Sequence, residues 1–356
     1  MSRNNSSRRH GALVQVSRQA MATEFVVMMP ERSGTDLDAA VSALEELDEI
    51  EARLTVYRES SEISRLNREA AGQPVPLSGD TFELLRRAIC WSRWSEGAFD
   101  VTAGPLVEAW GFTARRGRKP SSEEIREAMT RVGFGHLELD DSAHTARFRR
   151  PGMAVNLGAI GKGFALDRVA ERLRDAGARD FLIHGGQSSV LAAGDQIPGS
   201  GVGWAVGLAH PSKPQRRLAG VWLRDAAIGT SGSGKQFFHH RGRRFGHVID
   251  PRTGQPAGDL LSLTVILGSA TDADACATGL FVAGSEQAKR LATHSAGDCE
   301  TPRDAAGAEP LPLIMVHPAG RQDQVSTEAL GGIRWVEPPA DAGADMLEGF
   351  QGTGGE

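Results

Sequence analysis

The sequence predicts an α+β fold, and three observations carry the prediction. Apolar residues recur at helical spacing in the first half, whereas short apolar runs between glycine-bearing turns dominate after about residue 150. No internal repeat is present. Strands that do not alternate regularly with helices favour α+β over a doubly wound parallel sheet.

The first half begins with a strand and continues as helices. Glu24–Met29 has strand character. One apolar helix face follows, with residues at steps of three or four, namely Leu37, Val41, Leu44, Leu47, Ile50 and Leu54. A second helix is expected from about Asp80 to Ser95. Ser121–Glu124 has the pattern of a capping box that opens a third helix, which ends near Gly133.

The second half is predicted to be mostly strands with two helices. One helix is expected from about Lys162 to Ala176, and another from Thr271 to Val282. The expected strands are the apolar runs Phe181–His184, Val202–Leu208, Gly220–Leu223, Phe245–Ile249 and Leu263–Leu267.

The composition is that of an ordinary globular protein. The chain has 356 residues, of which 40% are hydrophobic and 24% charged, with a net charge of −5. These values exclude intrinsic disorder, and no apolar stretch is long enough for a membrane-spanning helix. The mildly acidic balance gives no general attraction to nucleic acid. We therefore expect neither a membrane span nor a nucleic-acid partner.

Both ends are expected to be flexible and to flank one domain. Residues 1–18 form a basic lead, residues 19–335 the domain, and residues 336–356 a Pro/Gly-rich acidic tail. The lead lacks the apolar core of a signal peptide, and the first cysteine is Cys90, too late for a lipoprotein start. These features predict a cytoplasmic protein, and a periplasmic one only if an export signal is missing or atypical.

Gly229–Lys235 satisfies the GxxxxGK pattern of a phosphate-binding loop. Gln236 stands where that motif needs Ser or Thr for magnesium, and the following residues have the pattern of a turn and strand instead of a helix. We therefore reject the nucleoside-triphosphatase interpretation and expect a glycine-rich hairpin, which can still border a phosphate.

Three further segments carry candidate chemistry. Asn156–Gly163 combines glycines and Lys162 at a strand-to-helix turn, which suits an anion, although such turns are often only turns. Asp274 and Thr278 share a helix face and could bind Mg²⁺ through oxygen, while helix capping is the alternative. His247, before an Asp-Pro turn, could accept a proton near neutral pH, or could be purely structural.

Taken together and in order, these segments resemble the ApbE family of FAD:protein FMN transferases. The resemblance covers roughly residues 19 to 335. It rests on the segments Met21–Thr23, Leu54–Asn67, Gly97–Asp100, Gly104–Leu106, Trp110–Phe112, Asn156–Asp167, Gly185–Gly186, Thr230–Gly232, His247–Gly254 and Ala273–Thr278.

The resemblance implies an ApbE-like, T-fold-like single unit of mixed and antiparallel sheets flanked by helices, with the flavin between its helical and strand-rich parts. It implies FAD as the donor substrate, a Mg²⁺ ion, and transfer of the FMN half to a Thr or Ser hydroxyl of an acceptor flavoprotein with release of AMP. The implied FAD-site residues are Met21, Tyr57, Ala98, Phe99, Asp100, Asn156, Lys162, His247 and Ile249. Those implied around the metal are Ala159, Thr271, Asp274 and Thr278, and the catalytic pair is His247 and Asp274.

The chain departs from the family pattern at three positions. Asn156 and Gln187 stand where Asp is usual, and Gly161 stands where Ala is usual. Two alternatives therefore remain beside the transferase. One is an FAD pyrophosphatase that releases free FMN and AMP, and the other is a non-catalytic FAD-binding protein.

Overall fold

The computed structural model describes residues 12–31, 34–114, 116–232, 234, 237–293, 310–320 and 324–341. Its centre is an eight-stranded sheet in the order β1-β2-β6-β7-β10-β13-β14-β15, and every neighbouring pair is antiparallel. These strands are β1 Leu13–Ala20, β2 Thr23–Pro30, β6 Phe181–Gly185, β7 Ser189–Ala193, β10 Ala226–Gly232, β13 Ser262–Leu267, β14 Leu313–Pro318 and β15 Val325–Leu330.

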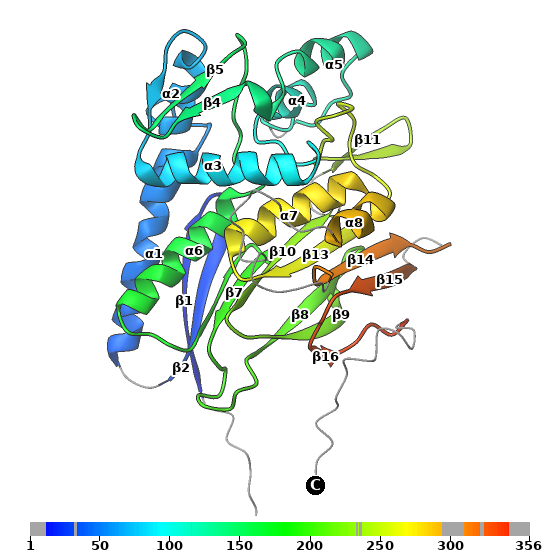
Figure 1. Cartoon of the computed structure of the whole chain (residues 1–356). Helices are drawn as coiled ribbons and strands as arrows, with labels where there is room; N and C mark the ends of the chain where they lie inside the picture. Colours follow the sequence, from blue (N-terminus) through cyan, green and yellow to red (C-terminus); the bar gives the residue numbers. More distant parts are fainter. Residues whose placement is uncertain are drawn as a thin grey trace, which may run out of the picture.

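Both faces of this sheet are covered because its central strands alternate between two apolar cores. Ile183 and Leu191 point to the face that packs against helices, whereas Leu182 and Val190 point to the opposite face. The helices are α1 Gly34–Leu54, α6 Gly161–Asp175 and α7 Ala270–Ala283, and Figure 1 shows them across the front of the sheet. A small sheet of order β16-β9-β8 covers the other face, with β8 Trp204–His210, β9 Lys213–Leu223 and β16 Trp335–Glu337.

The remaining elements form a mainly helical part beside the sheet, at the top of Figure 1. Its helix α3 packs against α7 of the sheet layer, which joins the two parts. The elements are α2 Glu62–Glu69, α3 Gly79–Trp94, α4 Gly104–Ala109, α5 Ser122–Met129, the 3₁₀ turn Phe134–His136, and a three-stranded sheet of β3 Val75–Pro76, β4 Leu137–Asp140 and β5 Thr145–Phe148. A hairpin of β11 Phe237–His240 and β12 Arg243–Gly246, and helix α8 Ser285–Ala292, complete the described chain.

The structure confirms the α+β fold and most of the predicted elements. The capping box at Ser121 and Glu124 is present with both of its hydrogen bonds. The long apolar helix exists, but Leu37 and Val41 are each 42% exposed, because its first turns bury Ala40 and Ala43 instead. Helices α2, α4 and α8 were not predicted, since six to eight residues hold too few turns to show a period.

Three predicted boundaries are wrong. Strand β1 begins at Leu13, inside the expected lead, because it pairs along its whole length with β2. The tail boundary at 335 divides β16, whose pairing with β9 extends to Glu337. The run Phe245–Ile249 is strand only as far as Gly246, before the chain turns at Asp250–Gly254. Residues 1–11 and 342–356 lie outside the described residues.

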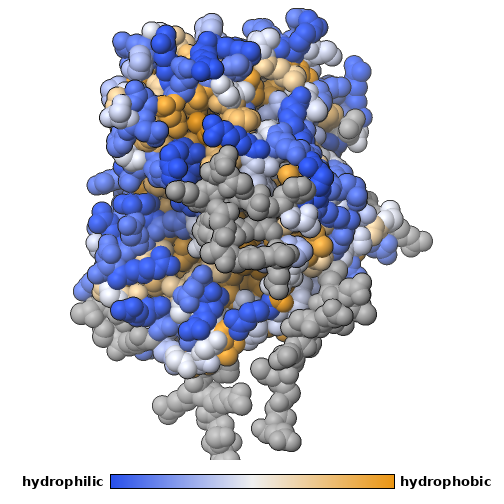
Figure 2. Space-filling model, viewed as in Figure 1, coloured by the Kyte–Doolittle hydropathy of each residue, from blue (hydrophilic) through white to orange (hydrophobic). Residues whose placement is uncertain are grey.

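The surface is mostly hydrophilic, with hydrophobic residues in small separate areas, as Figure 2 shows for one face. Within the described ranges, no helix combines the length and the apolar character needed to span a membrane.

Candidate functional site

A cavity of about 730 Å³ lies between the helical part and the sheet. Its walls come from segments that are far apart in sequence, including the β1–β2 turn, the loop before α4, the start of α6, and strands β8, β10 and β13. Every predicted site residue except Thr271 lines it, namely Met21, Tyr57, Ala98, Phe99, Asp100, Asn156, Ala159, Lys162, His247, Ile249, Asp274 and Thr278. The tertiary structure therefore brings the predicted set into one place.

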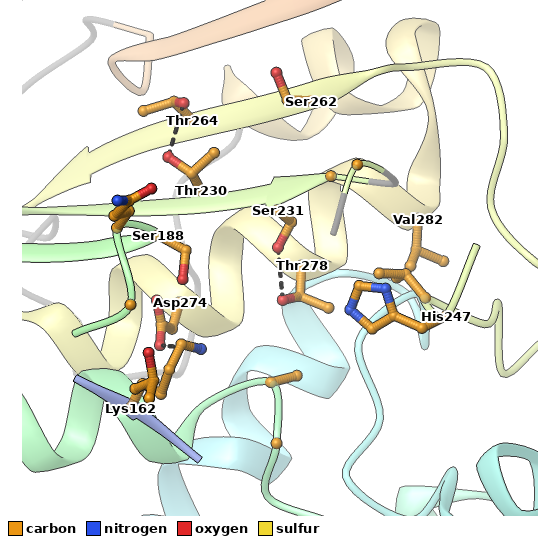
Figure 3. A pocket seen from close by; sticks show the side chains of 18 of the residues that line it. Lys162, Ser188, Thr230, Ser231, His247, Ser262, Thr264, Asp274, Thr278 and Val282 are labelled. Atoms are coloured by element: carbon orange, nitrogen blue, oxygen red, sulfur yellow. Dashed lines mark hydrogen bonds and ion pairs between the residues drawn. The ribbon is translucent and has the colours of Figure 1, made fainter. Parts of the chain in front are cut away.

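Asp274 is the buried carboxylate of this cavity, with only 5% of the residue exposed. Its Oδ1 accepts a hydrogen bond from Ser189 Oγ at 2.7 Å, and its Oδ2 accepts one from the backbone N–H of Gly163 at 2.8 Å. Lys162 Nζ lies 3.7 Å from Oδ2. Burial raises the pKa of Asp274, and Lys162, Ser189 and Gly163 oppose that rise. Figure 3 shows Lys162 and Asp274 directed toward each other.

Lys162 owes its position to close packing between two helices. A Cβ at Gly163 would lie 2.0 Å from the carbonyl oxygen of Ala270, so only glycine lets the start of α6 come this near to α7. The glycine-rich segment that was expected to bind an anion thus has a packing role as well. It fixes Lys162 beside Asp274, where its positive charge can serve both the carboxylate and an anionic ligand.

Thr271 is not among the residues that line the cavity, and its place around a metal stays a prediction. Its Oγ1 donates to Asp167 Oδ2 at 2.6 Å, and its backbone N–H donates to the same oxygen at 2.9 Å. Asp167 also accepts from Ser269 Oγ and from the backbone N–H of Ala270. Asp167 and Thr271 therefore anchor the first turn of α7, because the free N–H groups of a helix start need acceptors.

Asp100 and Asn156 line the cavity, and the side chains of both accept hydrogen bonds from backbone N–H groups. Asp100 accepts from the N–H and the hydroxyl of Thr102 and from the N–H of Phe134, while burial raises the pKa of its carboxyl. Asn156 Oδ1 accepts from the N–H of Gly158 at 2.9 Å. That bond needs an acceptor oxygen and no charge, so an amide can replace a carboxylate here.

His247 and Tyr57 supply rings at two points of the cavity wall. The His247 ring stands edge-on to Phe112, with centroids 6.3 Å apart. Figure 3 places it near Thr278 and Val282 of α7. Tyr57 is 65% exposed, unusual for a large aromatic side chain in a cavity wall, and so offers an open ring face.

Hydroxyl side chains beside the predicted Thr278 also line the cavity, and the sequence did not single them out as site residues. Thr230 and Thr264 form a hydroxyl–hydroxyl hydrogen bond of 2.9 Å across β10 and β13, and Ser231 and Thr278 form another of 2.9 Å. All four line the cavity, together with Ser188 and Ser262. Gly229 lets β10 approach α7, because a Cβ there would lie 2.2 Å from the carbonyl oxygen of Ala273.

The segment Thr230–Gly232 is the sequence signal for two of these hydroxyls, but its glycines predict a hairpin there. Gly229–Gly232 is the end of β10, and the hairpin itself begins at Phe237. Lys235 and Gln236, on which the comparison with a phosphate-binding loop rested, lie outside the described residues.

The donor set around Asp274 suits one kind of metal ion. The described residues contain no group of three or more His, Cys, Asp or Glu side chains that could hold a metal. Zinc-like sites need such a group, whereas Mg²⁺ is commonly held by one or two carboxylates, water and substrate phosphates. Asp274, Thr278 and Ala159 all line this cavity and carry oxygen atoms, the donor type that Mg²⁺ prefers, so the residues present fit that ion.

The chain is similar to proteins of one family in both sequence and structure. The sequence model of the ApbE family matches residues 19–301. The FAD:protein FMN transferase of Haemophilus influenzae is 34% identical over 254 residues, which cover 69% of this chain and 72% of the relative. That of Escherichia coli K12 is 30% identical over 289 residues, covering 76% and 82%.

Solved structures agree with the sequence matches. The flavin transferase ApbE of Vibrio cholerae superposes with a TM-score of 0.74 at 29% identity, over 90% of this chain and 97% of that one. The flavinyl transferase ApbE of Pseudomonas stutzeri gives 0.75 at 27% identity, over 90% and 95%. The family match, the curated relatives and the shared fold lead to one conclusion: the chain belongs to the ApbE family.

Proposed function

We propose that this protein transfers the FMN half of FAD to a threonine or serine hydroxyl of an acceptor flavoprotein and releases AMP. The observation that carries the proposal is the buried Asp274 beside Lys162 in a cavity of about 730 Å³, within the usual size range of ligand pockets. Its relatives are named FAD:protein FMN transferases, which supports the same activity.

The cavity offers distinct surfaces to the parts of FAD. The exposed ring of Tyr57 suits stacking on a flat heterocycle. The ammonium group of Lys162 suits the negative charge of the diphosphate. The hydroxyls on β10 and β13 can exchange hydrogen bonds with sugar and phosphate oxygens. One charged anchor and several neutral hydrogen-bonding groups are the usual composition of a ligand pocket.

Asp274, Thr278 and the carbonyl of Ala159 would hold Mg²⁺ against the diphosphate. The bound ion would act as a Lewis acid toward the phosphoryl oxygens. Lys162 neutralises charge on the same groups, and Ser189 and Gly163 hold the Asp274 carboxylate in a fixed orientation. This preorganisation matters because electrostatic stabilisation is greatest where the protein dipoles need not move.

We assign the proton of the acceptor hydroxyl to His247, whose side chain lines the cavity. In the proposed reaction the acceptor Oγ bonds to the phosphorus of the FMN half, and the bond from that phosphorus to the bridging oxygen breaks. AMP departs with the bridging oxygen, while the hydroxyl proton passes to the imidazole of His247. An imidazole can accept that proton at neutral pH because its ordinary pKa is about 6.5.

The test follows FAD turnover with and without Mg²⁺ in the presence of a threonine-bearing acceptor from a candidate flavoprotein of the same cell. Chromatography measures AMP and FMN, and mass spectrometry detects flavin on the acceptor. Mg²⁺-dependent flavin on the acceptor with one AMP per transfer is the expected result. Free FMN alone would favour the pyrophosphatase, and bound but intact FAD would mean a binding protein.

A further inference from the structure

Basic side chains gather beside the cavity on two segments of the chain. Arg116, Arg118 and Lys119 lie in the loop after α4, and His239, Arg241 and Arg244 lie on the β11–β12 hairpin. We call these six residues the basic rim. Neither residues 109–122 nor residues 226–249 contain an Asp or a Glu. In a chain with a net charge of −5, this is a local concentration of positive charge.

The loop and the hairpin form one unit with an aromatic centre. Phe238 stacks on Phe245 with centroids 5.4 Å apart and also contacts Trp110. A Cβ at Gly117 would lie 2.4 Å from the Phe238 ring, so the loop rests directly on the hairpin. Lys119 Nζ lies 5.9 Å from the centre of the Phe245 ring. The cations are therefore held on a packed support.

The rim borders the cavity on the side of His247. Gly234 before the hairpin and His247 after it both line the cavity, so the hairpin leaves the cavity wall and returns to it. Phe112 and Thr113, which precede the basic loop, line the cavity too. Figure 1 shows β11 next to α4 and α5, at the edge of the helical part.

Three cations of the rim have no counter-ion among the described residues. Arg116, Lys119 and Arg241 are exposed and form no ion pair with the part of the chain that the structure describes. Arg118 pairs with Glu124 at 2.7 Å, and the Arg244 guanidinium lies 4.0 Å above the Phe237 ring. A set of like charges kept together at the surface raises the local potential and attracts the opposite charge.

We propose that the basic rim binds an acidic surface of the acceptor protein and so brings its hydroxyl to His247. This inference rests on the proposed function and names the partner surface for the same site. FAD does not account for the rim, because Lys162 and the proposed Mg²⁺ ion would together offset the charges of its diphosphate and of Asp274 inside the cavity. The acceptor has to approach from outside and reach His247, and the rim lies on that approach. Complementary charge fixes orientation and raises the association rate more than it adds affinity.

The experiment compares a charge-reversed rim with a matched control. Arg116→Glu/Arg241→Glu reverses two rim charges. The control, Arg147→Glu/Arg179→Glu, makes the same change in net charge at two other exposed arginines. Arg147 lies on β5. Arg179 precedes β6, at the end of β6 that is farthest from the cavity. The probes are labelled peptides of equal length with one threonine and an acidic, neutral or basic flank. Fluorescence anisotropy measures peptide binding, mass spectrometry measures FMN transfer, and FAD binding is titrated separately.

We expect the wild-type protein to bind the acidic peptide about tenfold more tightly than the basic one at low salt, and this preference to weaken as salt is added. The rim variant should lose or invert the preference, while the control variant keeps it and both bind FAD as the wild type does. If the wild type bound all three peptides equally, or if both variants lost the preference for the acidic peptide equally, the proposal that the basic rim binds the acceptor would be overturned. A single-stranded oligonucleotide that displaces the acidic peptide at physiological salt would overturn it in favour of nucleic acid.

The two proposals fail in different ways. If the rim variant abolishes charge-dependent peptide binding and no FMN transfer is detected, the role of the basic rim is supported and the proposed transferase activity is contradicted. Transfer to all three peptides at equal rates supports the transferase and contradicts the rim.

Discussion

Asp272 and Asp274 lie two residues apart in α7 and are almost equally buried, yet they belong to different regions of the molecule. Asp272 faces α3, where its carboxylate accepts from Arg87 at 2.5 Å and from Trp91 Nε1 at 2.7 Å. Asp274 faces the cavity, where its nearest cation is Lys162 at 3.7 Å. Two residues along a helix turn the side chain by about 200°, so neighbours in sequence face opposite sides.

The difference separates a carboxylate that builds the fold from one available for chemistry. Asp272 is held by a close ion pair and an indole N–H, which are structural partners on α3. Asp274 has only neutral donors within hydrogen-bond distance, and burial raises its pKa. A buried carboxylate whose counter-ion lies beyond hydrogen-bond distance costs stability unless a ligand or metal compensates it, and such groups cluster at functional sites.

The largest expected effect is on the cavity side. Asp274→Asn should lower kcat by about 10³-fold, about 4 kcal/mol of transition-state stabilisation, because the cavity loses its one candidate metal carboxylate. The variant should remain folded, since the amide oxygen can still accept from Gly163. Initial rates at saturating FAD and Mg²⁺, with circular dichroism as the folding control, make the measurement. Activity near the wild-type level would refute the assignment.

The second effect is on the α3 side and concerns stability. Asp272→Ala should lower the free energy of unfolding by about 2–3 kcal/mol, because it leaves Arg87 and the Trp91 indole without their acceptor. Urea denaturation measures this loss. The activity per folded molecule should stay close to that of the wild type, so a large fall in kcat would remove the distinction between the two aspartates.

The third effect tests the cation of the cavity. Lys162→Met keeps most of the side-chain volume and removes the charge that faces Asp274 and the proposed diphosphate. We expect FAD binding to weaken about tenfold, which is about 1.4 kcal/mol. Fluorescence titration with FAD measures it, and riboflavin, which lacks phosphates, serves as the control ligand. Equal weakening for both ligands would place Lys162 away from the phosphates.

A fourth, smaller effect depends on pH and is measured without Mg²⁺ or FAD. Because the pKa of Asp274 is raised in the folded protein, its contribution to stability is present below the unfolded pKa, near 3.8, and is lost as pH rises through the folded value. Asp274→Asn should therefore melt at a higher temperature than the wild type at neutral pH, and the difference should shrink toward pH 4. A constant difference across that range would show that the carboxylate does not titrate as proposed.

The smallest effect is expected at Asn156. Asn156→Asp restores the acid usual in the family, while the bond from Gly158 needs only an acceptor oxygen. We expect kcat/KM to change by less than about threefold, below 0.7 kcal/mol. A gain of a hundredfold would show instead that the natural amide had impaired the enzyme.

The sequence was sufficient for elements with strong local signals. The apolar period of α1, the capping box of α5 and the glycine stop after α6 were all visible in it, because each depends on neighbours within a few turns. The short helices α2, α4 and α8 were not, because tertiary packing stabilises them more than any local pattern does.

For the site, the sequence by itself determined which residue types were available: one lysine in a glycine-rich turn, a histidine before Asp-Pro, and an aspartate four residues before a threonine. Only the tertiary structure decided their roles. It turned Thr271 toward Asp167 and away from the cavity, and it placed the hydroxyls of Thr230 and Thr264 in the cavity wall. The physical reason is that a side chain's role depends on partners distant in sequence, and these are set by how α6, α7 and β10 pack, down to the glycines that let them touch.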